Sequence, residues 1–299
     1  DLISAHSNHP FILIWDDHET SNDTYKDGAE NHQEESEGSF DKRISAALQA
    51  YYEWQPIREN QKPYRKFTFG NLADLIILEE RLEGRTKQAN SLEDSSLFQI
   101  DRTMLGETQL DWFLNNLSDK TTQWKIIGNQ VVFSYLNYGR PDFNINLDSW
   151  DGYPVERQQI ADHIVNNKIS DVVFLTGDTH QSWAFEVNHI PLESNNPIKP
   201  YALEFGTPSI NSGNSDERFS NAPIQKLIDH ENYITDKSIN PHLKYTNTRD
   251  HGYLIIDLNK EKIKATWKYV KTLIRRDKSI KETVQIESDS KSNKLNKII

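Results

Sequence analysis

The sequence predicts an α/β fold built in layers, and three observations support that class. Strand-like runs alternate with helix-like periods along the 299 residues, as in sheets that are covered by helices. The apolar runs that end at Trp15 and Thr176 show no polar alternation, which indicates strands buried on both faces. A chain of this length can bury one large core, so we expect a single main domain.

Composition narrows the possible functions. Hydrophobic residues make up 35% of the chain and charged residues 26%, and the net charge is -11, which argues against nucleic acid as the main partner. There is no cysteine, so any metal must be held by oxygen and nitrogen ligands. No apolar run approaches the roughly 18 residues of a membrane span.

The first half of the chain contains these elements in order. The spacing of apolar residues predicts strands and helices at Phe11–Trp15 (a strand buried on both faces), Asp41–Trp54 (a helix with Asp41 as its N-cap), 66–80 (two strands around Gly70 and Asn71), Glu107–Leu117 (a helix) and 124–134 (a strand).

The second half continues the alternation. We expect a helix opened by Pro154 with Ile160 and Ile164 inward, a buried strand ending at Thr176, a half-exposed strand at 182–187, a loop-rich region at 206–250 and a closing hairpin at 251–270. Residues 276–299 are rich in Lys, Ser, Asp and Asn without aromatic residues, which predicts a flexible tail after a domain of residues 1–275.

Two of the predicted strands end in similar polar residues. WDDHE contributes Asp16, Asp17 and His18, and LTGDTH contributes Asp178 and His180. Ligands bind at the carboxyl ends of strands in open α/β sheets, so we expect these side chains to meet in one cleft. Asp178 and His180 are expected to share one face of an extended segment, since alternate side chains point the same way.

Metal binding competes with a simpler interpretation. An Asp or His after a strand commonly forms a turn or caps a helix. The neighbouring carboxylates of Asp16 and Asp17 repel each other, however, and a cation or hydrogen-bond donor offsets that repulsion. The recurrence of the pattern on two strand ends favours a metal site.

The segments WDDHETSND and LTGDTHQSWAFEV together resemble the PhoD-like, or alkaline phosphatase D, group of calcineurin-like metallophosphoesterases. WKIIGNQVVFS, DSWDGYPVERQQI and DLIILEERLEGR are also similar to that group, so the resemblance covers roughly residues 8–270. It implies a β-sandwich flanked by helices and hydrolysis of phosphate monoesters or diesters. It also implies two or more metal ions, Fe³⁺ and Ca²⁺ among them, with other divalent metals as alternatives.

The resemblance also implies roles for individual residues. Asp17, Asn22, Asp178 and His180 correspond to metal ligands, and His18 corresponds to an acid that faces the phosphate. The implied partner is a small phosphate ester, and the implied location is the periplasm or the exterior of the cell.

Two further residues are candidates for substrate binding. Arg140, in the loop NYGRPDF, could form a bidentate phosphate clamp, but a loop position favours the alternative of a solvated arginine. Asn129, at the end of a predicted strand, could hydrogen-bond the substrate or cap a turn.

The sequence departs from the family at its beginning. The family carries a GDxxY-like block before the segment that corresponds to DDHE, and no such block occurs here. The chain also begins without Met or an export signal. We therefore expect a piece that lacks the first strands of the family fold. Three hypotheses stay open: a metal-dependent phosphatase or phosphodiesterase, a non-catalytic anion-binding domain, and an inactive truncated form.

Overall fold

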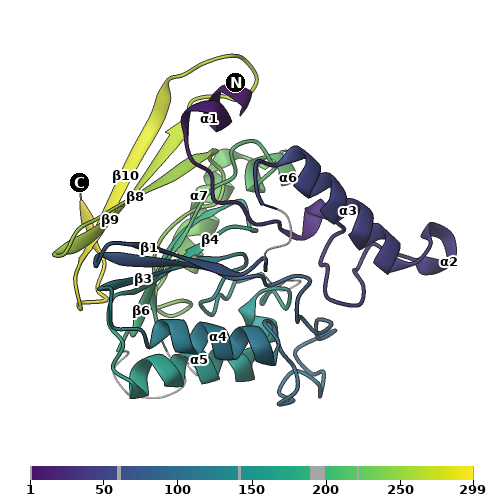
Figure 1. Ribbon diagram of the computed structural model, residues 1–299. Coiled ribbons are helices and arrows are strands. Elements are labelled where there is room, and N and C mark those ends of the chain that lie inside the picture. The colour runs from purple at the N-terminus through teal and green to yellow at the C-terminus, as the bar shows by residue number, and fades with distance from the viewer. Residues whose placement is uncertain (1, 59–61, 141–142, 189–198, 221, 299) are drawn as a thin grey trace.

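The computed structural model describes residues 2–58, 62–140, 143–188, 199–220 and 222–298. These residues form three layers, with helices α4 and α5 below a large sheet and a smaller sheet above it (Figure 1). This arrangement confirms the predicted α/β class and the sandwich flanked by helices. No helix in the described ranges is long and apolar enough to cross a membrane.

The large sheet has the strand order β1-β2-β3-β4-β6-β5-β7. Strands β2, β3, β4 and β6 run parallel, and the remaining pairs are antiparallel. The bounds are β1 Arg65–Phe69, β2 Ala73–Ile77, β3 Trp124–Asn129, β4 Val172–Thr176, β5 Ser182–Val187, β6 Ala202–Gly206 and β7 Leu243–Asn247. The carboxyl ends of the parallel strands therefore lie at the same end of the sheet.

The predicted hairpin at 66–80 is confirmed as the pair β1 and β2. Gly70 has a φ of 58° in the turn, a left-handed conformation that glycine adopts without a steric cost. Strand β1 is thus the edge strand of the sheet, and the C-terminal end of β2 lies beside the C-terminal ends of the other parallel strands.

Two helices cover one face of the large sheet, as predicted. They are α4 (Glu107–Leu117) and α5 (Pro154–Asn166). Phe113 and Ile160 from these helices belong to one buried cluster with Ile127 and Phe174 from the sheet. Pro154 stands in the first turn of α5, where its missing N–H removes no helical hydrogen bond.

The second sheet covers the opposite face, with the order β11-β10-β9-β8. Its strands are β8 (Gly252–Leu258), β9 (Lys262–Val270), β10 (Ile280–Asp289) and β11 (Asn296–Ile298). The pairing of β8 with β9 confirms the closing hairpin. Trp267 of β9 packs in a buried cluster with Val173 of β4, which joins the two sheets.

The prediction of a flexible tail at 276–299 is wrong. Strand β10 pairs with β9 along its length, and Val284 and Ile286 are buried. The composition of this region is polar because only alternate residues of β10 face the core. An average over the segment conceals that alternation.

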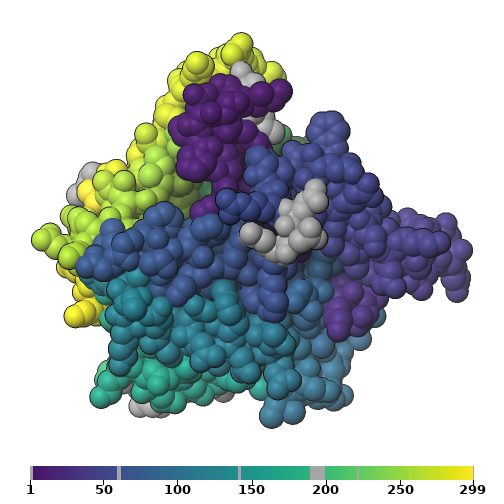
Figure 2. Space-filling view, viewed as in Figure 1, coloured from purple at the N-terminus to yellow at the C-terminus, as the bar shows by residue number. Residues whose placement is uncertain are grey.

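The prediction of a buried strand at Phe11–Trp15 is also wrong. The segment has no ladder partner among the described residues, and Phe11 and Ile12 stay exposed. The carbonyls of Leu13 and Trp15 instead accept hydrogen bonds from side chains. Apolar residues indicate that a segment contacts the core, but they do not show that it pairs with a neighbouring strand. Figure 2 shows the N-terminal residues, in purple, seated against the C-terminal strands and the β1–β2 pair.

Strand β5 differs from its predicted half-exposed state, since all six of its residues are buried. The second sheet covers Ala184 on one face, and α7 (Ile224–Ile234) packs through Ile234 on Trp183 and Phe185. Helix α7 lies within the region predicted to be rich in loops. The alternation of polar and apolar residues in β5 therefore does not distinguish a core-facing side from a solvent-facing side, because both faces of the strand are covered.

The remaining helices flank this core. The predicted helix at 41–54 is confirmed as α3, although Ser39 and not Asp41 occupies the N-cap. The bounds are α1 Leu2–Asn8, η1 Asp17–Glu19, α2 Glu34–Glu37, α3 Phe40–Trp54, η2 Trp150–Gly152 and α6 Ser215–Arg218.

Candidate metal centre

The candidate site lies at the carboxyl ends of β2 and β4. Strand β2 leads to Arg81 through one leucine and two glutamates, and β4 leads to Asp178 through one glycine. The short helix η1 places Asp17 between these strand ends. Open α/β sheets bind ligands at this edge because side chains from separate strands converge there.

Three carboxylates converge at this edge. Asp16, Asp17 and Asp178 each offer an oxygen, and the three oxygens lie within 4.8 Å of one another. The structure thus brings Asp16, Asp17 and Asp178 together as expected, although no strand precedes Asp17 and neither His18 nor His180 belongs to this cluster. Hard cations prefer clusters of carboxylate oxygens of this kind.

Backbone groups hold Asp17 in place. Its side chain is buried, and its two oxygens accept hydrogen bonds of 2.8 Å from the N–H groups of His18 and Asp23. Each carboxylate oxygen keeps a further lone pair, so Asp17 can still bind a cation.

Asp178 and His180 adopt left-handed backbone conformations, with φ angles of 64° and 60°. The expectation of an extended segment with both side chains on one face is therefore wrong, because a tight turn follows Gly177. Such conformations are costly for residues other than glycine and are concentrated at functional sites. Thr179 between them accepts a hydrogen bond of 2.8 Å from Trp183, which anchors the turn.

The imidazole of His180 is oriented by the main chain. Its Nδ1 lies 2.7 Å from the carbonyl oxygen of Gly213. A carbonyl only accepts, so Nδ1 carries the proton, and it is Nε2 that offers a lone pair when the ring is neutral. This is the arrangement in which a histidine binds a metal.

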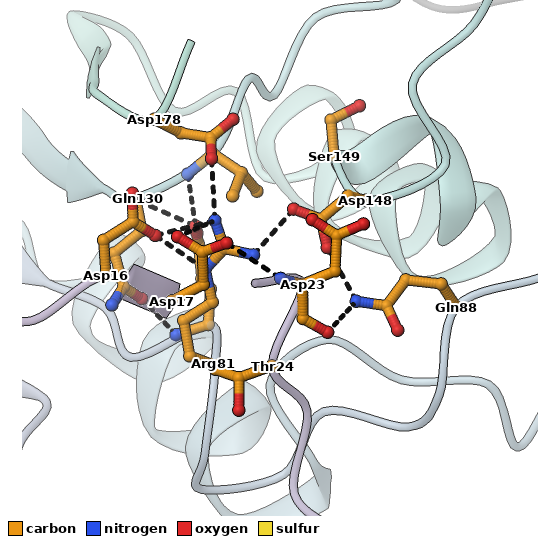
Figure 3. A network of polar contacts seen from close by, with 12 residues as sticks. Asp16, Asp17, Asp23, Thr24, Arg81, Gln88, Gln130, Asp148, Ser149 and Asp178 are labelled. Atoms are coloured by element: carbon orange, nitrogen blue, oxygen red, sulfur yellow. Dashed lines mark hydrogen bonds and ion pairs between the residues drawn. The ribbon is translucent and has the colours of Figure 1, made fainter. Parts of the chain in front are cut away.

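A buried arginine connects the carboxylates (Figure 3). The Nε atom of Arg81 lies 2.7 Å from Asp16, Nη1 lies 2.6 Å from Asp148, and Nη2 lies 2.8 Å from Asp178. Asp17 is 3.9 Å from the same Nη2. The guanidinium therefore orients the acidic side chains around itself.

The acidic groups of the site outnumber its cations. Arg81 and Arg85 supply two positive charges, and five carboxylates surround them: Asp16, Asp17, Asp23, Asp148 and Asp178. The excess is negative, and a metal cation is the ligand that would compensate it.

The pKa values of these acids reflect the same imbalance. Burial, followed by the charge of Asp148, raises the pKa of Asp23 to about 7. Burial and then Asp16 raise the pKa of Asp178 well above its usual range, although Arg81 opposes the shift. Burial would also raise the pKa of Asp148, but Arg81 and Arg85 outweigh it and hold that pKa at about 2.

His18 and Asn22 lie together at the rim of the site. The Nε2 atom of His18 is 3.0 Å from Oδ1 of Asn22, and the amide nitrogen of Asn22 is 2.5 Å from Glu30. The His18 side chain is 74% exposed. The two residues thus contact each other in this structure, and the three-carboxylate cluster does not include them.

The two predicted substrate-binding residues have different surroundings. Arg140 lines a cavity of about 760 Å³ together with Asp178 and His180. Asn129 is buried, and its amide group lies 3.2 Å from the indole nitrogen of Trp150 and 3.3 Å from the Thr176 hydroxyl. These contacts hold the strand ends together.

Sequence reasoning missed Arg81, Arg85 and Asp148. A usable signal was present, because the polar run EERLEGR follows the apolar strand β2 just as DDHE and GDTH follow apolar runs. The same rule about strand ends, applied to a third strand, would have selected Arg81.

Comparison with known proteins places this chain in a family. A model of PhoD-like phosphatases matches residues 1–267. The chain belongs to the PhoD-like phosphatase family. It is 36% identical over 251 residues to alkaline phosphatase D of Bacillus subtilis, an alignment that covers 79% of this chain and 42% of that relative.

A solved structure of PhoD resembles this PhoD-like chain along its whole length. The TM-score is 0.83 at 29% identity, and the match covers 100% of this chain and 56% of the solved one. The chain thus spans less than half the length of its curated relative. The segments that contain Asp17 and Asp178 both lie inside the residues matched by the family.

Proposed function

We propose that this PhoD-like chain provides the catalytic site of a metal-dependent hydrolase of phosphate esters. The observation that carries the proposal is the cluster of Asp16, Asp17 and Asp178, whose oxygens lie within 4.8 Å of one another. Membership of the PhoD-like phosphatase family supports phosphoester hydrolysis as the reaction. The negative excess around Arg81 supports occupation of the cluster by cations.

We assign the metal ligands to Asp17, Asn22, Asp178 and His180. The lone pair on Nε2 of His180 and the remaining lone pairs of both carboxylates support this set. Asn22 would have to exchange its contact with His18 for the metal. A bound cation of this kind lowers the pKa of water from 15.7 to about 7 and neutralises phosphate oxygens.

The protein's own residues would perform the remaining steps. Asp17 and Asp178 hold fixed positions through backbone and Arg81 contacts, so the reacting groups meet a preorganised site. His18 stands at the solvent-facing rim, from where its imidazole could donate a proton to the leaving oxygen. Arg140 would contact the phosphate from the side of the cavity, and Asn129 is the weaker candidate because its amide is already hydrogen-bonded.

Family membership also suggests the setting of the reaction. We propose a small phosphate monoester or diester as substrate, and the periplasm or the cell exterior as the location. Fe³⁺ and Ca²⁺ are the proposed metals, and elemental analysis would distinguish them from other divalent ions.

The test measures metal content and turnover on the same samples. Asp178→Asn removes a charge at nearly constant size, so we expect metal content and hydrolysis of 4-nitrophenyl phosphate to fall together. Asp111→Asn on the exposed face of α4 is the matched control and should change neither. His18→Ala should retain metal and lose roughly 10²–10⁴-fold in turnover on esters with poor leaving groups.

Two results would contradict the proposal. Full metal content and activity in Asp178→Asn would show that the site is elsewhere. Metal retention without any hydrolysis in the unmodified protein would favour an anion-binding domain.

A further inference from the structure

The cavity of about 760 Å³ opens directly beside the candidate metal centre. Asp178 and His180 form part of its wall, and the turn that contains Asn214, the short helix α6 and one face of α7 form much of the rest. Its volume is in the range of sites that bind small molecules. A phosphate held at Asp178 would therefore place the group attached to it in this cavity.

The cavity is cationic in a chain whose net charge is -11. Arg140, Arg218 and Lys226 line it. Arg218 and Lys226 are exposed, and neither forms an ion pair with any residue that the structure describes. These two charges are available to a ligand.

The acidic residues of the cavity are already engaged. Glu217 accepts hydrogen bonds of 2.9 Å from the N–H of Asn214 and from the imidazole of His251. Asp178 contacts Arg81. With histidines counted as neutral, three cations face two carboxylates in the lining, so its formal net charge is positive.

Aromatic rings supply an apolar wall next to these charges. Phe143 and Phe219 line the cavity and are each 37% exposed. The guanidinium of Arg140 lies 5.9 Å and 5.3 Å from the two ring centroids, and that of Arg218 lies 5.8 Å from Phe219. These stacked groups form a surface that suits a flat or apolar body.

The wall of the cavity also contains polar residues. Asn214 is 5% exposed and lines the cavity, and its amide nitrogen has no hydrogen-bond partner among the described residues. A buried donor without a partner is destabilising. Burial, followed by the charge of Arg140, lowers the pKa of His230, another residue of the cavity wall.

We infer that the cavity is the leaving-group subsite and that it selects phosphate esters whose leaving group joins an apolar body to a second negative charge. This inference rests on the proposed hydrolysis. The cations recognise the second charge, and Phe143 with Phe219 contacts the apolar body.

The test compares two esters that differ in one charge: 4-nitrophenyl phosphate and 3-carboxy-4-nitrophenyl phosphate. We expect the carboxylated ester to have a KM about ten-fold lower, since two solvent-exposed charge contacts each contribute modestly. The double variant Arg218→Gln/Lys226→Gln should abolish that difference, because it removes the two charges that recognise the carboxylate. Lys237→Gln, beyond the end of α7, is the matched control and should behave like the unmodified protein.

A binding measurement separates this inference from the proposed function. Calorimetry with phenylphosphonate and 3-carboxyphenylphosphonate should show tighter binding of the carboxylated compound, and only the double variant should lose the preference. Hydrolysis of both esters with equal KM and equal phosphonate affinity would overturn the subsite and leave the function intact. Charge-dependent binding without hydrolysis would contradict the function alone. Absence of binding for both phosphonates would overturn the subsite.

Discussion

Arg81 shows how one residue organises the candidate site. It is fully buried, and its partners Asp16, Asp148 and Asp178 are 65, 67 and 97 residues away in the chain. A buried charge is tolerated only when it is paired, and removal of one partner from such a group typically costs 3–5 kcal/mol. The carboxylates are consequently held in position before any cation binds.

A second buried residue, His242, predicts a pH dependence of stability. Its Nε2 lies 2.7 Å from the carbonyl oxygen of Tyr135, and its Nδ1 has no partner among the described residues. Burial lowers its pKa from 6.5 to about 4. Between these values the unfolded chain binds a proton that the folded chain does not, so stability falls as the pH decreases.

We expect this residue to account for about 2 kcal/mol of the stability lost between pH 8 and pH 5. The variant His242→Gln does not titrate, so its loss over that interval should be smaller by the same amount. Urea unfolding of both proteins at the two pH values measures the difference. His9→Gln, at an exposed position, is the control. Equal losses in all three proteins would contradict the assignment to His242.

At the scale of elements, β10 and α7 complete surfaces that earlier elements leave open. Strand β10 extends the second sheet next to β9, and α7 covers Trp183 and Phe185 of β5. Both elements come from regions whose composition is polar, because each contributes only one face to the core. The formation of such an element depends more on the surface that its neighbours leave uncovered than on the pattern of its own residues.

The role of β10 leads to a prediction for stability. Ile286 is 2% exposed and belongs to the cluster between the sheets. Ile286→Ala should lower the free energy of unfolding by about 2–5 kcal/mol, the usual range for a deleted buried side chain. Thr283→Ala, on an exposed position of the same strand, should change it by less than about 0.5 kcal/mol. Chemical unfolding measures both, and equal small effects would mean that β10 is not part of the core.

At the scale of the whole molecule, the two sheets share one core. Trp267 of β9 donates a hydrogen bond of 2.9 Å to the carbonyl oxygen of Gly206 at the end of β6. The cluster around it includes Leu203 of the large sheet and Ala265 of the small one. Separation of the sheets would expose this apolar surface to water, so neither sheet is independent of the other.

We therefore expect the two sheets to unfold together. Far-ultraviolet circular dichroism and tryptophan fluorescence should give the same urea midpoint. Trp267→Phe should lower the free energy of unfolding by about 1–3 kcal/mol, because the Gly206 carbonyl loses its hydrogen-bond donor. Both urea midpoints should therefore fall by the same amount. Trp54→Phe, at a residue that is 83% exposed, is the control. Separate midpoints, with the second sheet lost first, would contradict a shared core.

Local patterns were sufficient to predict most of the elements and part of the site. Periodicity located the helices at 107–117 and 154–166 and the hairpins at 65–77 and 252–270, since it reports which side of a segment avoids water. Polar residues after apolar runs located Asp17 and Asp178, and the resemblance of the surrounding segments located the family.

Long-range packing decided what these patterns do not contain. The segment Phe11–Trp15 is apolar like a strand, yet β pairing requires a neighbour whose free backbone groups are aligned with it, and the segment forms no ladder with any described strand although it lies near the edge strand β1. The tail became β10 because β9 offered such an edge. Arg81 joined the site because its charge, once buried, required partners from distant parts of the chain. Contacts of this kind depend on which surfaces meet in three dimensions, and sequence periodicity describes only one surface at a time.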